Sequence, residues 1–341
     1  MQLFEPSDNS GLLPIAYFHA LARLGAEGLI LIEPARSFVS LGTFDDAATT
    51  VDRDYCRDHG IPVMRRETGG GMVLLGPGQI FYTLVLKRPH ALVPSRVDDA
   101  YRHLSQAPIE VYRRFGVAAR LRPINDIVTA AGRKIGGQGA GDIHGHFCFV
   151  GSILVDFDTD LMQRIVRLPD EGLRPALKTA LEEGLSCVHA ETGSRPSAQA
   201  VKAALAEAFA PLVGGLQPRP VPACLMARAR EVAQELSSAG VVDGEETRPR
   251  PRPLFKVHEG LYLCQRAIAA PGGTITVSLA IRDQRIAAAS LLPAPGATGL
   301  DLSALIGRSF DREALALALP DVSALGLGRE DFIAALLAPG R

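Results

Sequence analysis

The 341-residue sequence predicts an α+β protein in which a large N-terminal domain precedes a small C-terminal one. Three observations support this. The chain is longer than one ordinary hydrophobic core needs. Within residues 1–214, segments with helical spacing of apolar residues alternate with short runs rich in β-branched residues. Residues 215–253 are rich in proline and charge, which indicates a linker with one connecting helix, and residues 254–341 then form an α+β accessory domain.

In the large domain, apolar spacing and turn residues define the predicted elements in order. The predicted helices are Pro14 to Leu24, Val51 to His59, a pair from Val97 to Phe115 divided at Pro108, one after Asp158, and Ser197 to Phe209. The predicted strands are Leu29 to Ile32, Phe38 to Leu41, Pro62 to Arg66, Ile80 to Leu86, Ile127 to Val128, and Phe147 to Phe157.

The connecting helix is predicted at Leu225 to Leu236. In the small domain, strands are predicted near Phe255 to Val257, Leu261 to Ile268, Thr274 to Ala280 and Arg285 to Leu291, with a hairpin turn at Gly272-Gly273. Short helices are predicted at Leu302 to Ile306, Arg312 to Leu319 and Glu330 to Leu337.

Composition restricts the functional class. The net charge is −1 with both signs interspersed, so we expect neither a nucleic-acid partner nor a membrane surface. The first residues lack the features of a secretion signal, and we expect a cytoplasmic protein. The five cysteines show no CxxC spacing, which argues against structural zinc and against a disulfide framework.

Two glycine-rich motifs carry the chemistry. The first is RRETGGGMV, residues 65–73, where three successive glycines leave backbone N–H groups open to a flat or extended ligand. A simple hairpin turn is the alternative interpretation. Arg66 is placed to orient a carboxylate or phosphate, or else to remain a solvated surface charge.

The second motif is NDIVTAAGRKIGGQGAGD, residues 125–142, in which Lys134 stands between a strand and a glycine-dense run. We interpret Lys134 as the cation that handles an anionic reactant. The alternative is a partly exposed lysine that pairs with Asp126 or Asp142. Asp126 is a candidate Mg²⁺ ligand, although Asn-Asp before a strand is also ordinary turn chemistry.

These two motifs, followed by GSILVDFD at residues 151–158, resemble the lipoate–protein ligase A family, within the superfamily of biotin and lipoate ligases. VSLGTFDD (39–46), GLSCVHAETG (184–193) and the small C-terminal domain also match that family's elements. The resemblance implies a large mixed-sheet catalytic domain. It also implies that ATP activates lipoate or octanoate to acyl-AMP, and that the acyl group passes to a lysine of a lipoyl domain or of an acceptor similar to H protein.

The resemblance also implies roles for individual residues. Lys134 is the catalytic residue, which bridges the acyl and phosphate oxygens. The acyl pocket is assigned to Gly42, Arg66, Thr68, Gly69, Gly70, Gly71, Met72 and Val73. The nucleotide and phosphates are assigned to Asn125, Asp126, Gly136, Gly137, Gly139 and Gly151, with Asp126 as the Mg²⁺ ligand.

Two alternatives stay open. An octanoyltransferase would take octanoate from acyl carrier protein through a cysteine, for which Cys148 and Cys187 are the candidates. In favour of this alternative, Cys187 would share a strand face with His189. Against it, Asn125 stands at the position, upstream of the lysine, where cysteine-dependent relatives tend to carry their nucleophile. A non-catalytic binder of lipoyl carriers is the other alternative. Many ligases have a histidine where this chain has Leu74-Leu75, and serines and an alanine where it has Gly136 to Gly139.

Overall fold

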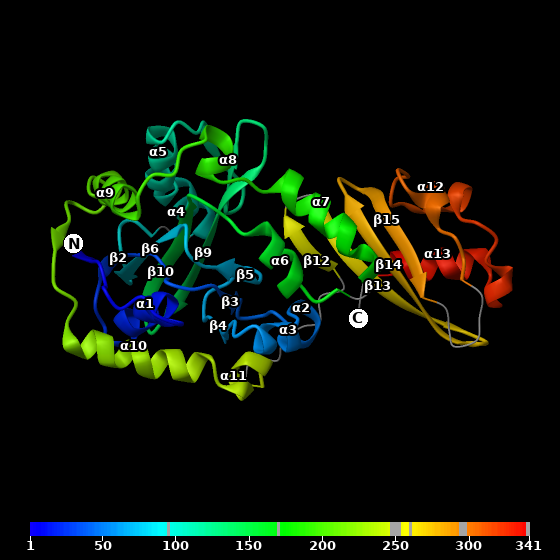
Figure 1. Cartoon of the computed structure of the whole chain (residues 1–341), viewed down its shortest axis with the longest axis horizontal. Coiled ribbons are helices and arrows are strands. Elements are labelled where there is room, and N and C mark those ends of the chain that lie inside the picture. Colours follow the sequence, from blue (N-terminus) through cyan, green and yellow to red (C-terminus); the bar gives the residue numbers. More distant parts are fainter. Residues whose placement is uncertain (94–95, 169–170, 246–253, 259–260, 293–298, 339–341) are drawn as a thin grey trace. The chain divides into compact units, whose positions relative to one another are not determined.

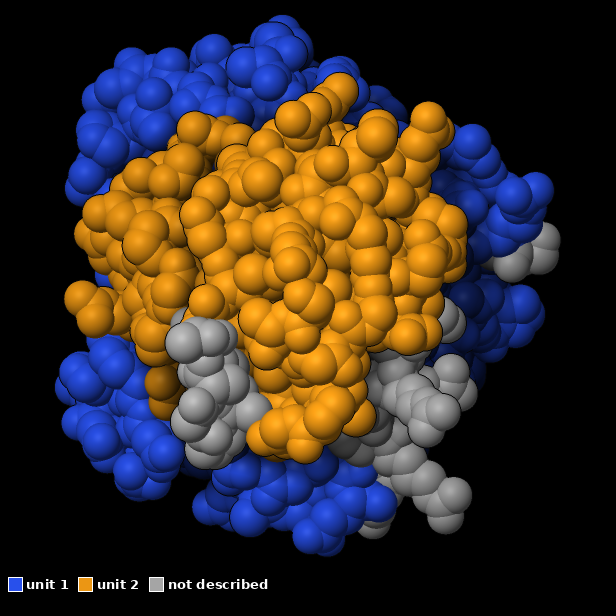
Figure 2. Space-filling model, turned by 90° about the vertical axis from the view of Figure 1, so that its right-hand side faces the viewer, with its two compact units in different colours: residues 1–47, 53–158, 184–249 blue, residues 48–52, 159–183, 250–341 orange. Residues whose placement is uncertain are grey.

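The computed structural model describes residues 1–93, 96–168, 171–245, 254–258, 261–292 and 299–338. It forms two compact units, coloured separately in Figure 2. Unit 1 comprises Met1–Ala47, Arg53–Asp158 and Gly184–Pro249, and unit 2 comprises Ala48–Asp52, Thr159–Glu183 and Arg250–Arg341.

The predicted large domain, residues 1–214, therefore contributes two segments to unit 2. Within unit 2, Val51 forms a bridge with Val166, and the Asp52 N–H donates to the Ile165 carbonyl at 2.8 Å. These bonds join residues 48–52 to 159–183. The division at residues 214 and 253 stays a prediction.

Unit 1 contains the elements that position the candidate site. Its strands are β1 (Gln2–Phe4), β2 (Gly28–Ile32), β3 (Phe38–Leu41), β4 (Val63–Arg65), β5 (Val73–Leu75), β6 (Gln79–Lys87), β7 (Ala119–Arg122), β8 (Asp126–Thr129), β9 (Lys134–Ile143), β10 (His146–Leu154) and β11 (Gln217–Pro218). Its helices are α1 (Leu13–Arg23), α3 (Arg53–Asp58), α4 (Val97–Leu104), α5 (Gln106–Arg114), α8 (Val188–Thr192), α9 (Ala198–Phe209), α10 (Ala223–Leu236) and α11 (Ala239–Asp243).

The main sheet of unit 1 has the order β11-β1-β2-β6-β10-β9-β8-β7. β1 pairs in parallel with both of its neighbours, and the other pairs are antiparallel, so the sheet is mixed. A small sheet, β4-β3-β5, carries the first motif at the ends of β4 and β5. The predicted α+β class with a large mixed sheet is confirmed.

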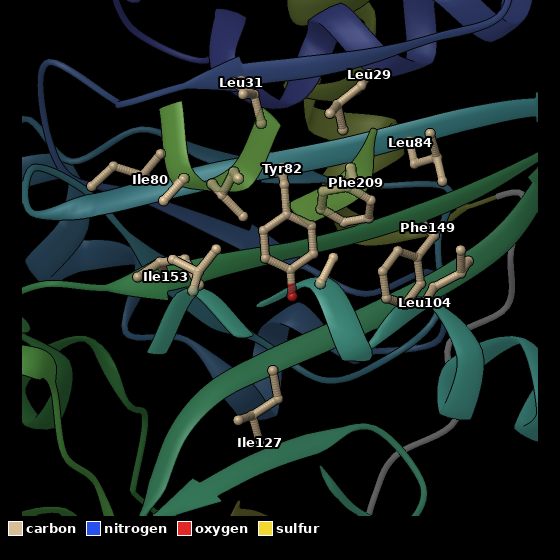
Figure 3. Packing of buried hydrophobic residues seen from close by; sticks show 14 of the residues in the cluster. Leu29, Leu31, Ile80, Tyr82, Leu84, Leu104, Ile127, Phe149, Ile153 and Phe209 are labelled. Atoms are coloured by element: carbon tan, nitrogen blue, oxygen red, sulfur yellow. The ribbon is translucent and has the colours of Figure 1, made fainter. Parts of the chain in front are cut away.

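Alternating residues send side chains to the two faces of the main sheet, and each face has its own core. The first core packs between the sheet and helices α4, α5 and α9, and contains Tyr82, Phe149 and Phe209 (Figure 3). The second packs against α1, α10 and the small sheet, elements that Figure 1 labels. Phe18 and Leu225 are buried in this core. Each fully buried large side chain contributes about 1.5–3 kcal/mol to stability.

Unit 2 contains an antiparallel sheet in the order β12-β13-β14-β15, as the four predicted C-terminal strands require. Its strands are β12 (Leu254–His258), β13 (Leu261–Ala270), β14 (Gly273–Arg282) and β15 (Arg285–Leu292). Its helices are α6 (Thr159–Ile165), η1 (Glu171–Leu173), α7 (Arg174–Gly184), η2 (Ser303–Leu305), α12 (Arg312–Ala318), η3 (Ser323–Leu325) and α13 (Arg329–Leu337), while α2 (Ala47–Thr50) begins in unit 1. No helix in the described ranges combines the length and apolar character that crossing a bilayer requires.

Two local predictions were wrong, and one strand was not predicted. The helix pair 97–115 divides at Ser105 rather than at Pro108, because Pro108 lies in the first turn of α5, where a missing N–H costs little. The glycine-dense run after Lys134, for which no strand was predicted, belongs to a ten-residue strand, β9. Cys187 and His189 do not share a strand, because Cys187 caps the N-terminus of α8, its sulfur accepting from the Ala190 N–H at 3.4 Å.

Candidate active site

Lys134 begins β9, and its ammonium is held by a carboxylate on the neighbouring strand. The distance from Lys134 Nζ to Asp126 Oδ1 is 2.7 Å, and Arg122 Nη2 lies 3.1 Å from Asp126 Oδ2. Burial acts to raise the pKa of Asp126, but the charges and hydrogen bonds of Lys134 and Arg122 outweigh it, so that the pKa is lowered. The pairing with Asp126 that the alternative interpretation of Lys134 named is therefore present, whereas Asp142 pairs with Arg88. The Lys134 side chain stays 27% exposed, which leaves an oriented cation available to a reactant.

The glycines of β9 form a bare strip beside this ammonium. Gly137, Gly139 and Gly141 alternate along the strand and so share one face of the sheet. A Cβ added to Gly137 would lie 3.4 Å from Lys134 Nζ. One added to Gly139 would lie 3.4 Å from the Gly69 carbonyl oxygen, and one added to Gly141 would lie 3.2 Å from Thr68 Cα. Lys134 and the triple-glycine loop therefore lie next to each other on the glycine strip, which brings the two sequence motifs together.

Arg66 holds the triple-glycine loop from within. Its side chain is buried, and its guanidinium donates to the carbonyls of Gly69 at 2.9 Å, Gly71 at 2.8 Å and Ser40 at 2.9 Å. The alternative of a solvated surface charge is wrong, because the fork geometry of arginine fits these converging backbone oxygens. The contacts give Arg66 a role in shaping the loop.

Gly42 and Gly70 make the loop's close approach possible. A Cβ on Gly42 would lie 1.9 Å from the Gly70 carbonyl oxygen, and Gly70 itself has φ of +93°. Both positions therefore require glycine. Among the described residues, the Gly70 and Gly71 N–H groups have no protein acceptor, which leaves two donors for oxygen atoms of a ligand.

The remaining loop residues differ in accessibility. Thr68 is fully buried, and its hydroxyl has no partner among the described residues. Met72 is buried and Val73 is 37% exposed, so only Val73 presents a substantial apolar surface to solvent.

A buried polar network that sequence reasoning missed fixes the middle of β9. Asn125 Nδ2 donates to the Gln138 carbonyl at 2.5 Å, and the Gln138 side chain joins the Ser105 hydroxyl at 2.7 Å and the Tyr82 hydroxyl at 3.1 Å. Asn125 and Gln138 lie in the second motif, but no local pattern marks Ser105 and Tyr82 as partners of Gln138, because they are 33 and 56 residues away in the chain.

Gly136 and Gly151, predicted to contact the nucleotide, lie where packing explains them. A Cβ on Gly136 would lie 3.2 Å from the Tyr112 hydroxyl, and one on Gly151 would lie 2.3 Å from that of Tyr82. Both tyrosines belong to the core on the other face of the sheet. We therefore assign these glycines to tyrosine packing.

Neither candidate nucleophilic cysteine is activated. Cys148 is buried in the core beneath α1, and burial, with the charges of Glu67 and Asp142, raises the pKa of its thiol. Burial also raises the pKa of the Cys187 thiol. A thiolate nucleophile needs a lowered pKa, so these environments suit inert thiols.

The predicted role of Asp126 as a Mg²⁺ ligand does not fit the contacts that its carboxylate makes. Both oxygens of Asp126 are engaged by Lys134 and Arg122. The described part of the chain contains no group of three His, Cys, Asp or Glu residues that could hold a metal ion. Asp126 therefore serves as the partner of Lys134, and we derive no step through a metal bound to it.

Comparison with known families identifies this arrangement. Residues 16–210 match the lipoyl protein ligase A/B catalytic domain. The chain belongs to this family. An octanoyltransferase LipM from Kyrpidia tusciae is 28% identical over 226 residues, covering 60% of this chain and 81% of that protein. Lipoate-protein ligase A subunit 1 from Thermoplasma acidophilum is 27% identical over 159 residues, covering 44% of this chain and 59% of that protein.

Solved structures share the fold. The bipartite lipoate protein ligase of Thermoplasma acidophilum, solved in a study with its E2 lipoyl domain, superposes with a TM-score of 0.63 at 23% identity, covering 75% of this chain and 98% of that one. A lipoate-protein ligase A bound with ATP superposes with a TM-score of 0.58 at 22% identity, and the match covers 71% of this chain and 97% of that one. Members of this family include both ligases and octanoyltransferases, so the donor of the acyl group has to be argued from the site.

Proposed function

We propose that the protein is an ATP-dependent lipoate–protein ligase. The observation that carries the proposal is the placement of Lys134, held by Asp126 over the glycine strip against which the triple-glycine loop lies. In this proposal, lipoate or octanoate and ATP are substrates, and Mg²⁺ enters with ATP. A lysine of a lipoyl domain or of an acceptor similar to H protein receives the acyl group.

In the first half-reaction, a carboxylate oxygen of the acid bonds to the α-phosphorus of ATP as the bond to pyrophosphate breaks. Two anions must approach each other, and the Lys134 ammonium lowers the barrier by lying between them. The Gly70 and Gly71 N–H groups, which have no acceptor in the described part of the chain, add donors for the carboxyl end of the acid.

In the second half-reaction, the acceptor lysine's neutral amine attacks the acyl carbon, the bond to AMP breaks, and the amine loses a proton. Lys134 then stabilises the developing negative charge on the carbonyl oxygen. Burying roughly five methylenes of the acyl chain, at ~0.8 kcal/mol each, supplies about 4 kcal/mol of binding energy. That energy favours medium-length chains.

The second candidate function is an octanoyltransferase, because the LipM proteins are among the similar relatives. A transferase of that kind would need a reactive thiol. Asn125 occupies the position upstream of the lysine, and Cys148 and Cys187 have raised pKa values. These facts support the ligase over the transferase.

The test compares two acyl donors. Purified apo-lipoyl domain would be incubated with the protein and either lipoate, with and without Mg·ATP, or octanoyl–acyl carrier protein, and its intact mass measured. The proposal expects a lipoyl-sized increase only with ATP, lost in Lys134→Gln. An octanoyl-sized increase from the carrier protein without ATP would replace the ligase with the transferase.

A further inference from the structure

One face of α1 contacts the first motif through two polar residues one helical turn apart, the buried His19 and the partly buried Arg23. The His19 side chain is fully buried. Its Nε2 accepts a hydrogen bond from the backbone N–H of Glu67 at 3.1 Å, and its Nδ1 lies 3.0 Å from the Ile15 carbonyl oxygen. Because the Glu67 N–H is a donor, Nε2 must be unprotonated and Nδ1–H donates to Ile15.

Arg23 holds the side chain of the same glutamate. Its Nη2 donates to Glu67 Oε2 at 3.1 Å, and its two terminal nitrogens also bind the carboxylate of Glu235 near the end of α10 at 2.7 and 2.8 Å. Glu67 is thus bound at its main chain by His19 and at its carboxylate by Arg23. We call these two residues the α1 clamp.

The clamp acts at the start of the triple-glycine loop. Thr68, the next residue, packs over Gly141, and Gly69 lies over Gly139. Arg66 fixes the loop carbonyls from inside, but the main-chain N–H of Glu67 is held from α1 alone among the described residues. The position of Glu67 therefore sets where the loop begins to follow the glycine strip.

His19 can keep this bond at any working pH. Desolvation by burial lowers its pKa to about 3, so the imidazole stays neutral and Nε2 stays an acceptor. A neutral acceptor buried on a helix is a rigid support for a loop whose conformation matters to within a few tenths of an ångström.

We infer that His19 is a positioning residue for the acyl substrate, which acts by fixing the Glu67 end of the triple-glycine loop through its Nε2. This inference rests on the proposed function, in which the loop receives the carboxylic acid. It assigns no contact between His19 and the substrate. It predicts that loss of the Nε2 acceptor weakens binding of the acid and leaves binding of ATP unchanged.

Two substitutions separate the contacts of His19. In His19→Asn the amide reaches the position of Nδ1 and retains the Ile15 contact, but it is too short to reach Glu67. In His19→Gln the carbonyl oxygen reaches the position of Nε2 and can accept from Glu67. His59→Asn is the matched control, because His59 makes the same Nδ1 contact to the carbonyl four residues earlier, at 2.9 Å to Tyr55, on the exposed surface.

The experiment measures the Kd of lipoate and of ATP by calorimetry, together with the Tm, for wild type and the three variants. We expect the lipoate Kd to rise about tenfold in His19→Asn, equivalent to 1.4 kcal/mol, and to return to within about threefold in His19→Gln. The ATP Kd should stay within twofold throughout, and His59→Asn should match wild type.

An unchanged lipoate Kd in His19→Asn, or an equal loss of lipoate and ATP affinity, would overturn the positioning role and leave the proposed function in place. The positioning role would also be overturned if His19→Gln binds lipoate no better than His19→Asn. If His19→Asn fails to melt cooperatively, His19→Gln tests the positioning role instead. That variant must then fold and bind lipoate within about threefold of the wild-type Kd, and weaker binding would overturn the role. A wild-type protein that does not bind lipoate would remove the proposed function itself.

Discussion

The tight approach of Gly42 to the triple-glycine loop makes Gly42→Ala a sharp test of the site. The new Cβ would lie 1.9 Å from the Gly70 carbonyl oxygen and 2.9 Å from its carbon, where an ordinary contact needs more than 3 Å. One of the two backbones must therefore move by at least about 1 Å.

Neither backbone is free to move without losing bonds. The Gly42 N–H donates to Asp45 Oδ2 at 2.8 Å, and its carbonyl accepts from Arg65 at 2.9 Å. On the other side, the Arg66 guanidinium holds the carbonyls that flank Gly70. Overpacking of this kind costs about 1–3 kcal/mol of stability, and a 1 Å displacement at a site costs roughly 10²-fold in rate.

The assay compares ATP-dependent transfer of lipoate to an apo-lipoyl domain with the Tm. The matched control is Gly28→Ala, whose Cβ would lie 3.0 Å from the Phe4 ring, in the second core and outside both motifs. We expect both variants to lower the Tm and only Gly42→Ala to lose about 10–100-fold in kcat/KM for lipoate. If Gly42→Ala keeps wild-type kcat/KM, or if both variants lose activity in proportion to their Tm, the loop does not form the acyl site.

Three further predictions follow from the same geometry. Asp126→Asn should lower the rate of acyl-adenylate formation by about 10–100-fold, because Lys134 loses the carboxylate that orients it; an unchanged rate would show that this pair is only structural. His19 should contribute a fall of about 1.4 kcal/mol per pH unit to the free energy of unfolding between about pH 6.5 and pH 3, because burial lowers its pKa to about 3 and unfolding lets it take up a proton. Denaturant titrations at several pH values should show a weaker pH dependence of the free energy of unfolding in His19→Gln than in wild type, and an equal dependence would exclude this contribution. Cys148→Ala and Cys187→Ser should retain ATP-dependent transfer within about threefold, whereas loss of all transfer in a folded variant would indicate an acyl-enzyme.

Much of the fold was readable from periodicity. Leu29 to Ile32 is continuously apolar, and Phe38 to Leu41 is apolar except at Ser40, because both faces of these strands are covered. Both strands were predicted within a residue or two. β9 was not predicted as a strand, because its glycines carry no pattern of side chains. Its strand conformation is set by pairing with β8 and β10, which is tertiary information.

Some residues of the candidate site were also predictable from the sequence, and others were not. Lys134 and the triple glycine stood out because few structural roles require such residues together, and the structure brings them to one strip of β9. His19 gave no signal, since a single histidine on an apolar helix usually belongs to the core. Its partner, Glu67, is 48 residues away in the chain, and no local pattern reports that distance.

The most direct test of the account is single-turnover formation of lipoyl-AMP from lipoate and Mg·ATP, without acceptor, by wild type and by Lys134→Gln. The account predicts about one equivalent of lipoyl-AMP with release of pyrophosphate by wild type, and a rate at least about 10²-fold lower in a folded Lys134→Gln protein. A wild-type protein that forms no lipoyl-AMP, or a Lys134→Gln protein that forms it at the wild-type rate, would contradict the central role given to this lysine.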